Sequence, residues 1–151
     1  MTTTIDQTPA EKEIHAAIDA WAQAIRMKDA SGVEVLFAED AVDFFLAPPL
    51  QATGPLKQNL EEWFASFDGA IGYEIRSLQT ATSGDLAYSH SFNRVTGRKL
   101  EGPYDDVWFR QTICFRKIDH RWLITHVHES VPFYMDGTFK AAVDLQPPAG
   151  S

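Results

Sequence analysis

Cysteine, positive charge and long apolar runs are all scarce in this 151-residue sequence, and each shortage excludes a class of protein. Cys114 is the single cysteine, so no internal disulfide can form and a reducing compartment is expected. The net charge of -8 disfavours nucleic acid and acidic lipids as partners. No apolar run approaches the ~18 residues of a membrane span, and residues 1–7 lack a signal-peptide pattern. We therefore expect a cytoplasmic protein that binds neither nucleic acid nor membrane.

Aromatic and aliphatic residues are abundant, with 44% hydrophobic residues that include 10 Phe, 4 Trp and 4 Tyr. This content is enough for one globular domain with a hydrophobic core. So many rings in a small domain suggest an aromatic-lined interior or a buried oligomer face. We expect a flexible N-terminus at residues 1–8, one domain at residues 9–135 and a C-terminal tail at residues 136–151.

Helix signals are concentrated in the first half of the chain. Thr8, Pro9 and Glu11 form a capping box that predicts a helix from Pro9 to about residue 28. Ser31 and Glu34 predict a second capping box and a short helix. A third helix is expected to follow Thr53-Gly54-Pro55 and to end near residue 68. The first helix has an apolar face at helical spacing that consists of Ile14, Ile18, Trp21 and Ile25.

Period-two alternation predicts strands in the second half of the chain. One earlier strand is expected at residues 42–46, with Asp43 and Phe45 on one face. The later strands are expected at residues 71–82, 86–95, 104–118 and 122–133, with turns between them. Helices first and an antiparallel meander afterwards indicate an α+β fold, with about three helices gathered on one face of a curved sheet.

The last predicted strand carries the densest group of proton-active side chains. Simple alternation places on one face Trp122, Ile124, His126, His128 and Ser130. This face changes from apolar to reactive along its length, as the floor of a ligand pocket would. A mid-strand serine has neither an oxyanion hole nor a nucleophile turn, so Ser130 does not indicate a serine hydrolase.

Three segments, Phe37–Val42, Gly84–Tyr88 and Arg121–Pro132, together with this order of elements, resemble the SnoaL-like group. That group belongs to the nuclear-transport-factor-two-like superfamily, which includes the ketosteroid isomerases. The resemblance covers about residues 9–135. It implies a cone-shaped α+β barrel that encloses a deep pocket, and a homodimer formed through the outer face of the sheet.

The same resemblance argues against steroid isomerase chemistry. Aligning residues 37–41 with the isomerases puts Trp21 where they have a helix tyrosine, and Phe45 where they have a proton-shuttling aspartate. Tryptophan offers one weak N–H donor and phenylalanine offers no base, so neither can replace the original group. Catalysis in this chain would then fall to the histidines of the last strand.

His126 and His128 leave three interpretations open. One imidazole could be a general acid or base, because histidine titrates near neutral pH. Both could bind a divalent metal, with a third ligand from His90, Asp43 or Asp106. Both could instead be structural histidines at the rim of a pocket. We expect them to line the pocket, and we expect no cofactor and no bound metal.

Asp43 is the acid expected on the pocket side of the first strand, either as the partner of a histidine or as an exposed residue at a strand start. His90 and Arg110 are the expected polarising groups, because an arginine among aromatic residues can bind an anionic or carbonyl ligand. The residues predicted to bind the ligand are Trp21, Phe45, Trp63, His90, Phe92, Trp108 and Arg110. The tryptophans are equally explained as core residues.

Two functions follow from these residues. The first is proton-transfer catalysis, such as isomerisation, dehydration or hydrolysis, on a compact apolar or aromatic small molecule. His128 or His126 would be the acid or base, with Asp43 as its partner. The second is a non-catalytic ligand-binding or dimerisation module of the same fold.

Overall fold

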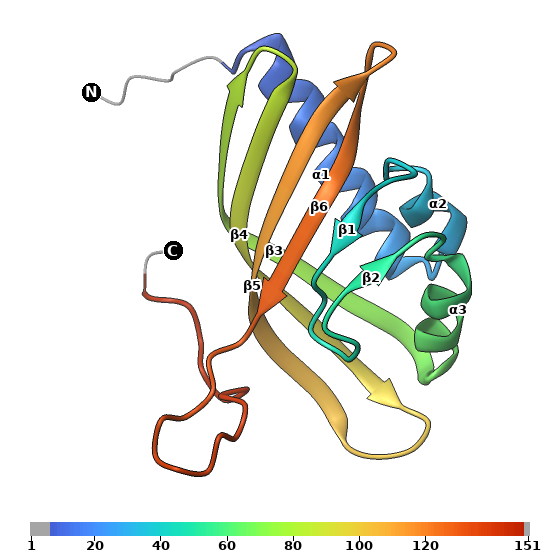
Figure 1. Cartoon of the computed structure of the whole chain (residues 1–151). Coiled ribbons are helices and arrows are strands. Elements are labelled where there is room, and N and C mark those ends of the chain that lie inside the picture. Colours follow the sequence, from blue (N-terminus) through green and yellow to red (C-terminus); the bar gives the residue numbers. More distant parts are fainter. Residues whose placement is uncertain (1–6, 150–151) are drawn as a thin grey trace.

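Three helices pack on a curved, open antiparallel sheet in the computed structural model, which describes residues 7–149 (Figure 1). The helices are α1 (Pro9–Arg26), α2 (Ala30–Glu34) and α3 (Lys57–Ala65). The sheet has the order β3-β4-β5-β6, formed by Phe67–Ser83, Leu86–Lys99, Tyr104–Ile118 and Arg121–Ser130. A small pair, β1 (Val42–Asp43) and β2 (Ala52–Thr53), lies between α2 and α3 in the chain. This arrangement confirms the predicted α+β class.

Some predictions about the ends of the chain are not addressed by the described residues. Most of the predicted flexible N-terminus, residues 1–6, and the last two residues of the tail lie outside them. Residues 131–149 turn back on themselves, with a bridge between Phe133 and Ala141. None of the helices within residues 7–149 is long and apolar enough to cross a membrane.

α1 begins as its capping signals predict and buries the predicted face. The Thr8 side chain accepts a hydrogen bond from the Glu11 backbone N–H, and Pro9 occupies the first helical position. The buried side chains of α1 form one cluster with the inner face of the sheet, including Ile113 and Phe115. The side chains of α1 in this cluster include Ile14, Ile18, Trp21 and Ile25.

The second predicted capping box is wrong, and the correction links two helices. Asp29, not Ser31, caps α2 by accepting a hydrogen bond from the Gly32 N–H. Glu34 instead reaches across to α3, where its Oε2 accepts from the backbone N–H groups of Leu56 at 2.9 Å and Lys57 at 2.7 Å. No local side chain caps α3. A carboxylate from α2 therefore supplies the acceptor that the start of α3 lacks.

Replacing Glu34 by alanine is expected to lower the free energy of unfolding by about 1–2 kcal/mol, since two N–H groups lose their acceptor. Chemical denaturation would measure the loss. Glu39→Ala is the matched control, because Glu39 is exposed and its replacement removes the same negative charge. Equal effects of the two variants would show that the interhelix cap contributes nothing.

A β-bulge in β6 determines which side chains face the interior. Cys114 pairs with His126, but the next residue of β5, Phe115, pairs with Ile124, so Thr125 is an extra residue. The Thr125 hydroxyl donates to the Cys114 carbonyl at 3.2 Å and so bridges the irregular step. A single inserted residue reverses the inside-outside alternation beyond it.

The prediction that the alternate residues of the last strand share one face is therefore wrong. Trp122 and Ile124 face the core, as predicted. Beyond the bulge the inward positions are Val127 and Glu129, whose partners on β5 are the buried residues Ile113 and Gln111. The outward positions are His126, His128 and Ser130, paired with Cys114, Thr112 and Arg110.

Candidate functional site

Asp43 and His126 link β1 to β6 just after the bulge at Thr125. The Val127 N–H donates to Asp43 Oδ1 at 2.9 Å, in place of a backbone carbonyl. His126 Nδ1 is in a short hydrogen bond with the Val42 carbonyl. A carbonyl can only accept, so Nδ1 carries the proton. The Phe44 ring packs edge-on against His126, with ring centroids 4.8 Å apart. His126 therefore has a structural position beside Asp43.

Asp43 is an acid held in an environment that disfavours its charge. Its side chain is only 2% exposed. Burial raises the pKa of Asp43 from 3.8 to about 6, against the opposing effects of the Val127 N–H and the nearby His126. A carboxyl group with a pKa near the working pH can both take up and release a proton.

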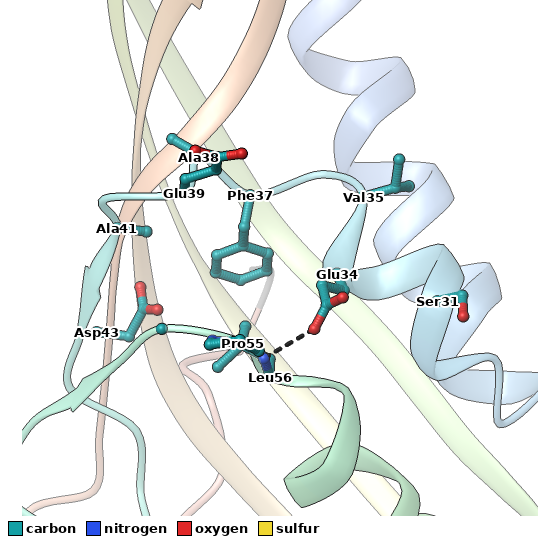
Figure 2. Close-up of a pocket in the computed structure, with 11 residues that line it drawn as sticks. Ser31, Glu34, Val35, Phe37, Ala38, Glu39, Ala41, Asp43, Pro55 and Leu56 are labelled. Atoms are coloured by element: carbon teal, nitrogen blue, oxygen red, sulfur yellow. Dashed lines mark hydrogen bonds between the residues drawn. The ribbon is translucent and has the colours of Figure 1, made fainter.

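Asp43 also lies on the wall of a cavity of about 530 Å³, a volume in the range of small-molecule sites. The cavity lies between α2, the segment that follows it, and the start of α3 (Figure 2). The Phe37 ring is drawn between the Asp43 and Glu34 carboxylates in this view, with Leu56 and Pro55 below it. Phe37 packs against Trp21, with ring centroids 5.4 Å apart. The cavity thus combines an aromatic wall with a proton-active carboxyl group.

Glu129 is the functional candidate that the sequence interpretation missed. It points to the inner side of β6, where burial raises its pKa from 4.5 to about 7. Hydrogen bonds from Gln111 and from the Leu46 N–H partly oppose that rise, whereas the negative charge of Asp43 adds to it. A signal was present in the sequence: Val127, not His126, continues the apolar inner face after Ile124. The inner face thus advances by three residues between Ile124 and Val127, whereas regular alternation advances by two, and a bulge produces this extra residue.

Glu129 belongs to a chain of buried polar groups along the inner face of the sheet. Gln111 Nε2 donates to Glu129 Oε2 at 2.8 Å, and Asn93 Nδ2 donates both to Gln111 Oε1 at 2.9 Å and to the Tyr73 hydroxyl at 2.6 Å. Ser91 donates to Asn93 Oδ1 at 2.6 Å. Burial, followed by the charge of Glu129, raises the pKa of Tyr73, so its hydroxyl stays protonated. These links connect the acid at the sheet edge with the interior beneath α1.

Most of the predicted ligand-binding residues lie on the outer face of the sheet. On this face His90 pairs with Thr112, Phe92 with Arg110, and Arg94 with Trp108. None of these six residues belongs to the hydrophobic cluster under α1. Arg110 donates to Ser130 on the same face at 3.0 Å. Placing His90, Phe92, Trp108 and Arg110 in the pocket is therefore wrong. These residues do share one face of the sheet, as predicted from the alternation, but that polar and aromatic face points outward.

The other three predicted residues have inner or rim positions. Trp21 is buried in the core, where its side chain lies beside the Tyr73 hydroxyl. Trp63 packs against Phe64 and Phe67 at the end of α3. Phe45 is partly buried and lines a second opening beside Glu129. Trp21 and Trp63 thus fit the alternative interpretation as packing residues.

The three histidines considered as metal ligands are spread over the outer face. His90 and His128 each pair with Thr112 and so flank the strand between them. Within residues 7–149, no group of three histidine, cysteine or acidic residues could hold a metal ion.

Comparison with known proteins gives one family and many similar structures. The family model of the SnoaL-like domain matches residues 14–134. No curated protein matches the chain. An NTF2-like protein of unknown function from Pseudomonas putida KT2440 is 33% identical, with a TM-score of 0.83, and the match covers 93% of this chain and 99% of that chain.

More distant structures share the fold, and two of them are named as dehydratases. A proposed scytalone dehydratase from Novosphingobium aromaticivorans DSM 12444 is 18% identical, with a TM-score of 0.73 and 94% of each chain covered. A proposed NTF2-like dehydratase from Streptomyces avermitilis is 17% identical, with a TM-score of 0.69, covering 82% of this chain and 97% of that one. At such identities the likeness shows the fold alone.

Proposed function

We propose that this chain, which belongs to the SnoaL-like domain family, binds a compact, largely apolar small molecule and catalyses proton transfer on it. The observation that carries the proposal is Asp43: a buried carboxyl group with a raised pKa on the wall of a cavity of about 530 Å³. Above about pH 6 this group is ionised and can act as a base. The cavity walls around it are mostly apolar or aromatic.

The supported reaction class is removal of a proton next to a carbonyl group. The Asp43 carboxylate takes the proton, and the electron pair moves into the carbonyl to form an enol or enolate. Return of the proton at another carbon completes an isomerisation. Alternatively, the electron pair returns to form a carbon–carbon double bond and expels a hydroxyl group from the next carbon, which takes the proton from Asp43 and leaves as water; this completes a dehydration. The dehydratase names of two structural relatives are consistent with the second outcome.

Deuterium exchange tests this proposal without knowledge of the natural substrate. The purified protein is incubated in heavy water with a panel of cyclic ketones and hydroxyketones, and NMR follows deuterium entering the carbon next to the carbonyl. We expect enzyme-dependent exchange with at least one compound. Compounds that bind without exchanging would favour the non-catalytic binding module instead.

The binding module is supported by a specific observation. His126 and His128 are outward-facing, so they cannot supply the interior acid-base chemistry predicted from the sequence. The candidates for acid-base chemistry are then Asp43, in the cavity wall, and Glu129, in the second opening. If Asp43 serves only to accept the Val127 N–H, the cavity binds without catalysing.

A homodimer through the outer face of the sheet remains our proposal for the assembly. Tyr88 is 49% exposed there and lies beside the rows of His90 and Phe92. Aromatic residues are enriched at protein interfaces, and a two-fold axis would pair this face with itself. The single cysteine and the acidic charge also support a cytoplasmic location.

Tyr88→Glu is expected to raise the dimer dissociation constant at least ~100-fold, because the two-fold axis brings two new charges together. Sedimentation velocity over a concentration series would measure it. Leu100→Glu is the matched control, since Leu100 is 65% exposed in the loop after β4. A monomeric wild-type chain, or equal effects of both variants, would contradict the proposed dimer face.

A further inference from the structure

A second opening lies at the far end of β6, apart from the cavity beside α2. Residues 44–50 form one wall of a groove of about 620 Å³, and His128 and Glu129 form the other. The wall is apolar and includes two phenylalanines and two prolines. Leu50 is 97% exposed and Leu46 is 44% exposed, so this apolar surface is open to water. A groove of this size can hold a small organic molecule.

Glu129 gives this apolar groove an uncompensated negative charge. Its carboxylate accepts hydrogen bonds from the Gln111 amide and the Leu46 N–H, which are both uncharged donors. None of the ion pairs within residues 7–149 includes Glu129. The next nearby charge is the acid Asp43. Arg110, the basic residue in the next row of the sheet, points to the outer face and donates to Ser130.

We infer that this groove binds a small organic cation, an alkylammonium or arylammonium ion, with its nitrogen at Glu129 and its apolar body along residues 44–50. Charge complementarity selects a cation, because Glu129 is the acid that lines the groove and none of the lining residues is a lysine or an arginine. The walls select an organic cation over a bare ion, since Phe44 and Phe45 offer both apolar contact and ring faces to an ammonium group. The inference concerns Glu129 and is independent of proton transfer at Asp43.

Three probes of one shape test the inference: benzylammonium, benzyl alcohol and benzoate, titrated at pH 8 by calorimetry with the full chain. We expect benzylammonium to bind about tenfold or more tightly than the other two. Glu129→Gln should abolish that preference, whereas Asp136→Asn, an equal charge change at an exposed site, should retain it. Benzyl alcohol or benzoate binding as tightly as benzylammonium would overturn the inference. So would a groove covered by a second copy of the chain, which would bind none of the three.

A second measurement on the wild-type chain covers the case in which Glu129→Gln fails to fold, which circular dichroism would reveal. Lowering the pH from 8 to 5.5 protonates Glu129, whose pKa is about 7, and should weaken benzylammonium binding about tenfold. His128 is the other ionisable residue of the groove wall. The titration is therefore repeated with His128→Gln, and affinity that no longer depends on pH in that variant would overturn the inference.

Discussion

Asp43→Asn is expected to lower deuterium exchange on a responsive ketone by about 10²–10⁴-fold, the usual contribution of a general base. Asparagine keeps the shape of the side chain and can still accept the Val127 N–H through its carbonyl oxygen, but it cannot take up a proton. NMR rates measured at saturating ketone would separate this effect from weaker binding. Because the ligand contacts remain, we expect the dissociation constant of the ketone to change little.

Asp40→Asn is the matched control for this experiment. Asp40 is exposed, lies three residues earlier in the same segment and carries the same charge. It should leave exchange at the wild-type rate. Full exchange activity in Asp43→Asn would remove Asp43 from the reaction and leave the cavity as a binding site.

Stability is expected to rise by about 2–4 kcal/mol as the pH falls from 8 to 5, as measured by urea denaturation across that range. The folded-state pKa values of Asp43 and Glu129, about 6 and about 7, lie above their ordinary values of 3.8 and 4.5. The folded chain therefore binds more protons than the unfolded chain between about pH 4.5 and pH 7. The resulting stability is complete below the ordinary values and is lost as the pH rises through the folded-state ones.

The double variant Asp43→Asn, Glu129→Gln should have a much flatter pH profile, and at pH 8 it should be more stable than the wild-type chain. Both changes remove charges that burial disfavours. A free energy of unfolding of the wild-type chain that declines steadily from pH 8 to pH 5 would show that folding does not raise the pKa values of these carboxyl groups. If the expected profile is found, the wild-type chain keeps two destabilising acids at neutral pH, which is a common cost of a functional site.

Local sequence signals predicted the elements well because each is set by nearby residues. Thr8 and Pro9 start α1, and Asp119 and His120, both with positive φ, make the turn between β5 and β6. Long-range contacts were not predictable in the same way. Glu34 had the spacing of a capping box within its own helix, but its actual partners are 22 and 23 residues away.

The candidate site was predicted only in part, for two physical reasons. Asp43 is buried, in agreement with the prediction of an acid on the inner side of the first strand. Beyond Thr125 every assignment on β6 was reversed, so His126 and His128 were placed in the interior and Glu129 was overlooked. Alternation along a strand cannot reveal which face is the inner one, so the outer-face residues His90 and Arg110 were misplaced as well.

The extra residue at Thr125 has a consequence for how relatives of this chain diverge. A relative that lost this one residue would present His126 and His128 inward and Glu129 outward, with an otherwise unchanged sequence. Its interior would exchange one carboxyl group for two imidazoles, without any substitution at the site. Alignments that place a gap a few positions away would equate Glu129 with residues of the opposite face. Relatives of this fold are best compared in this strand by their cross-strand partners.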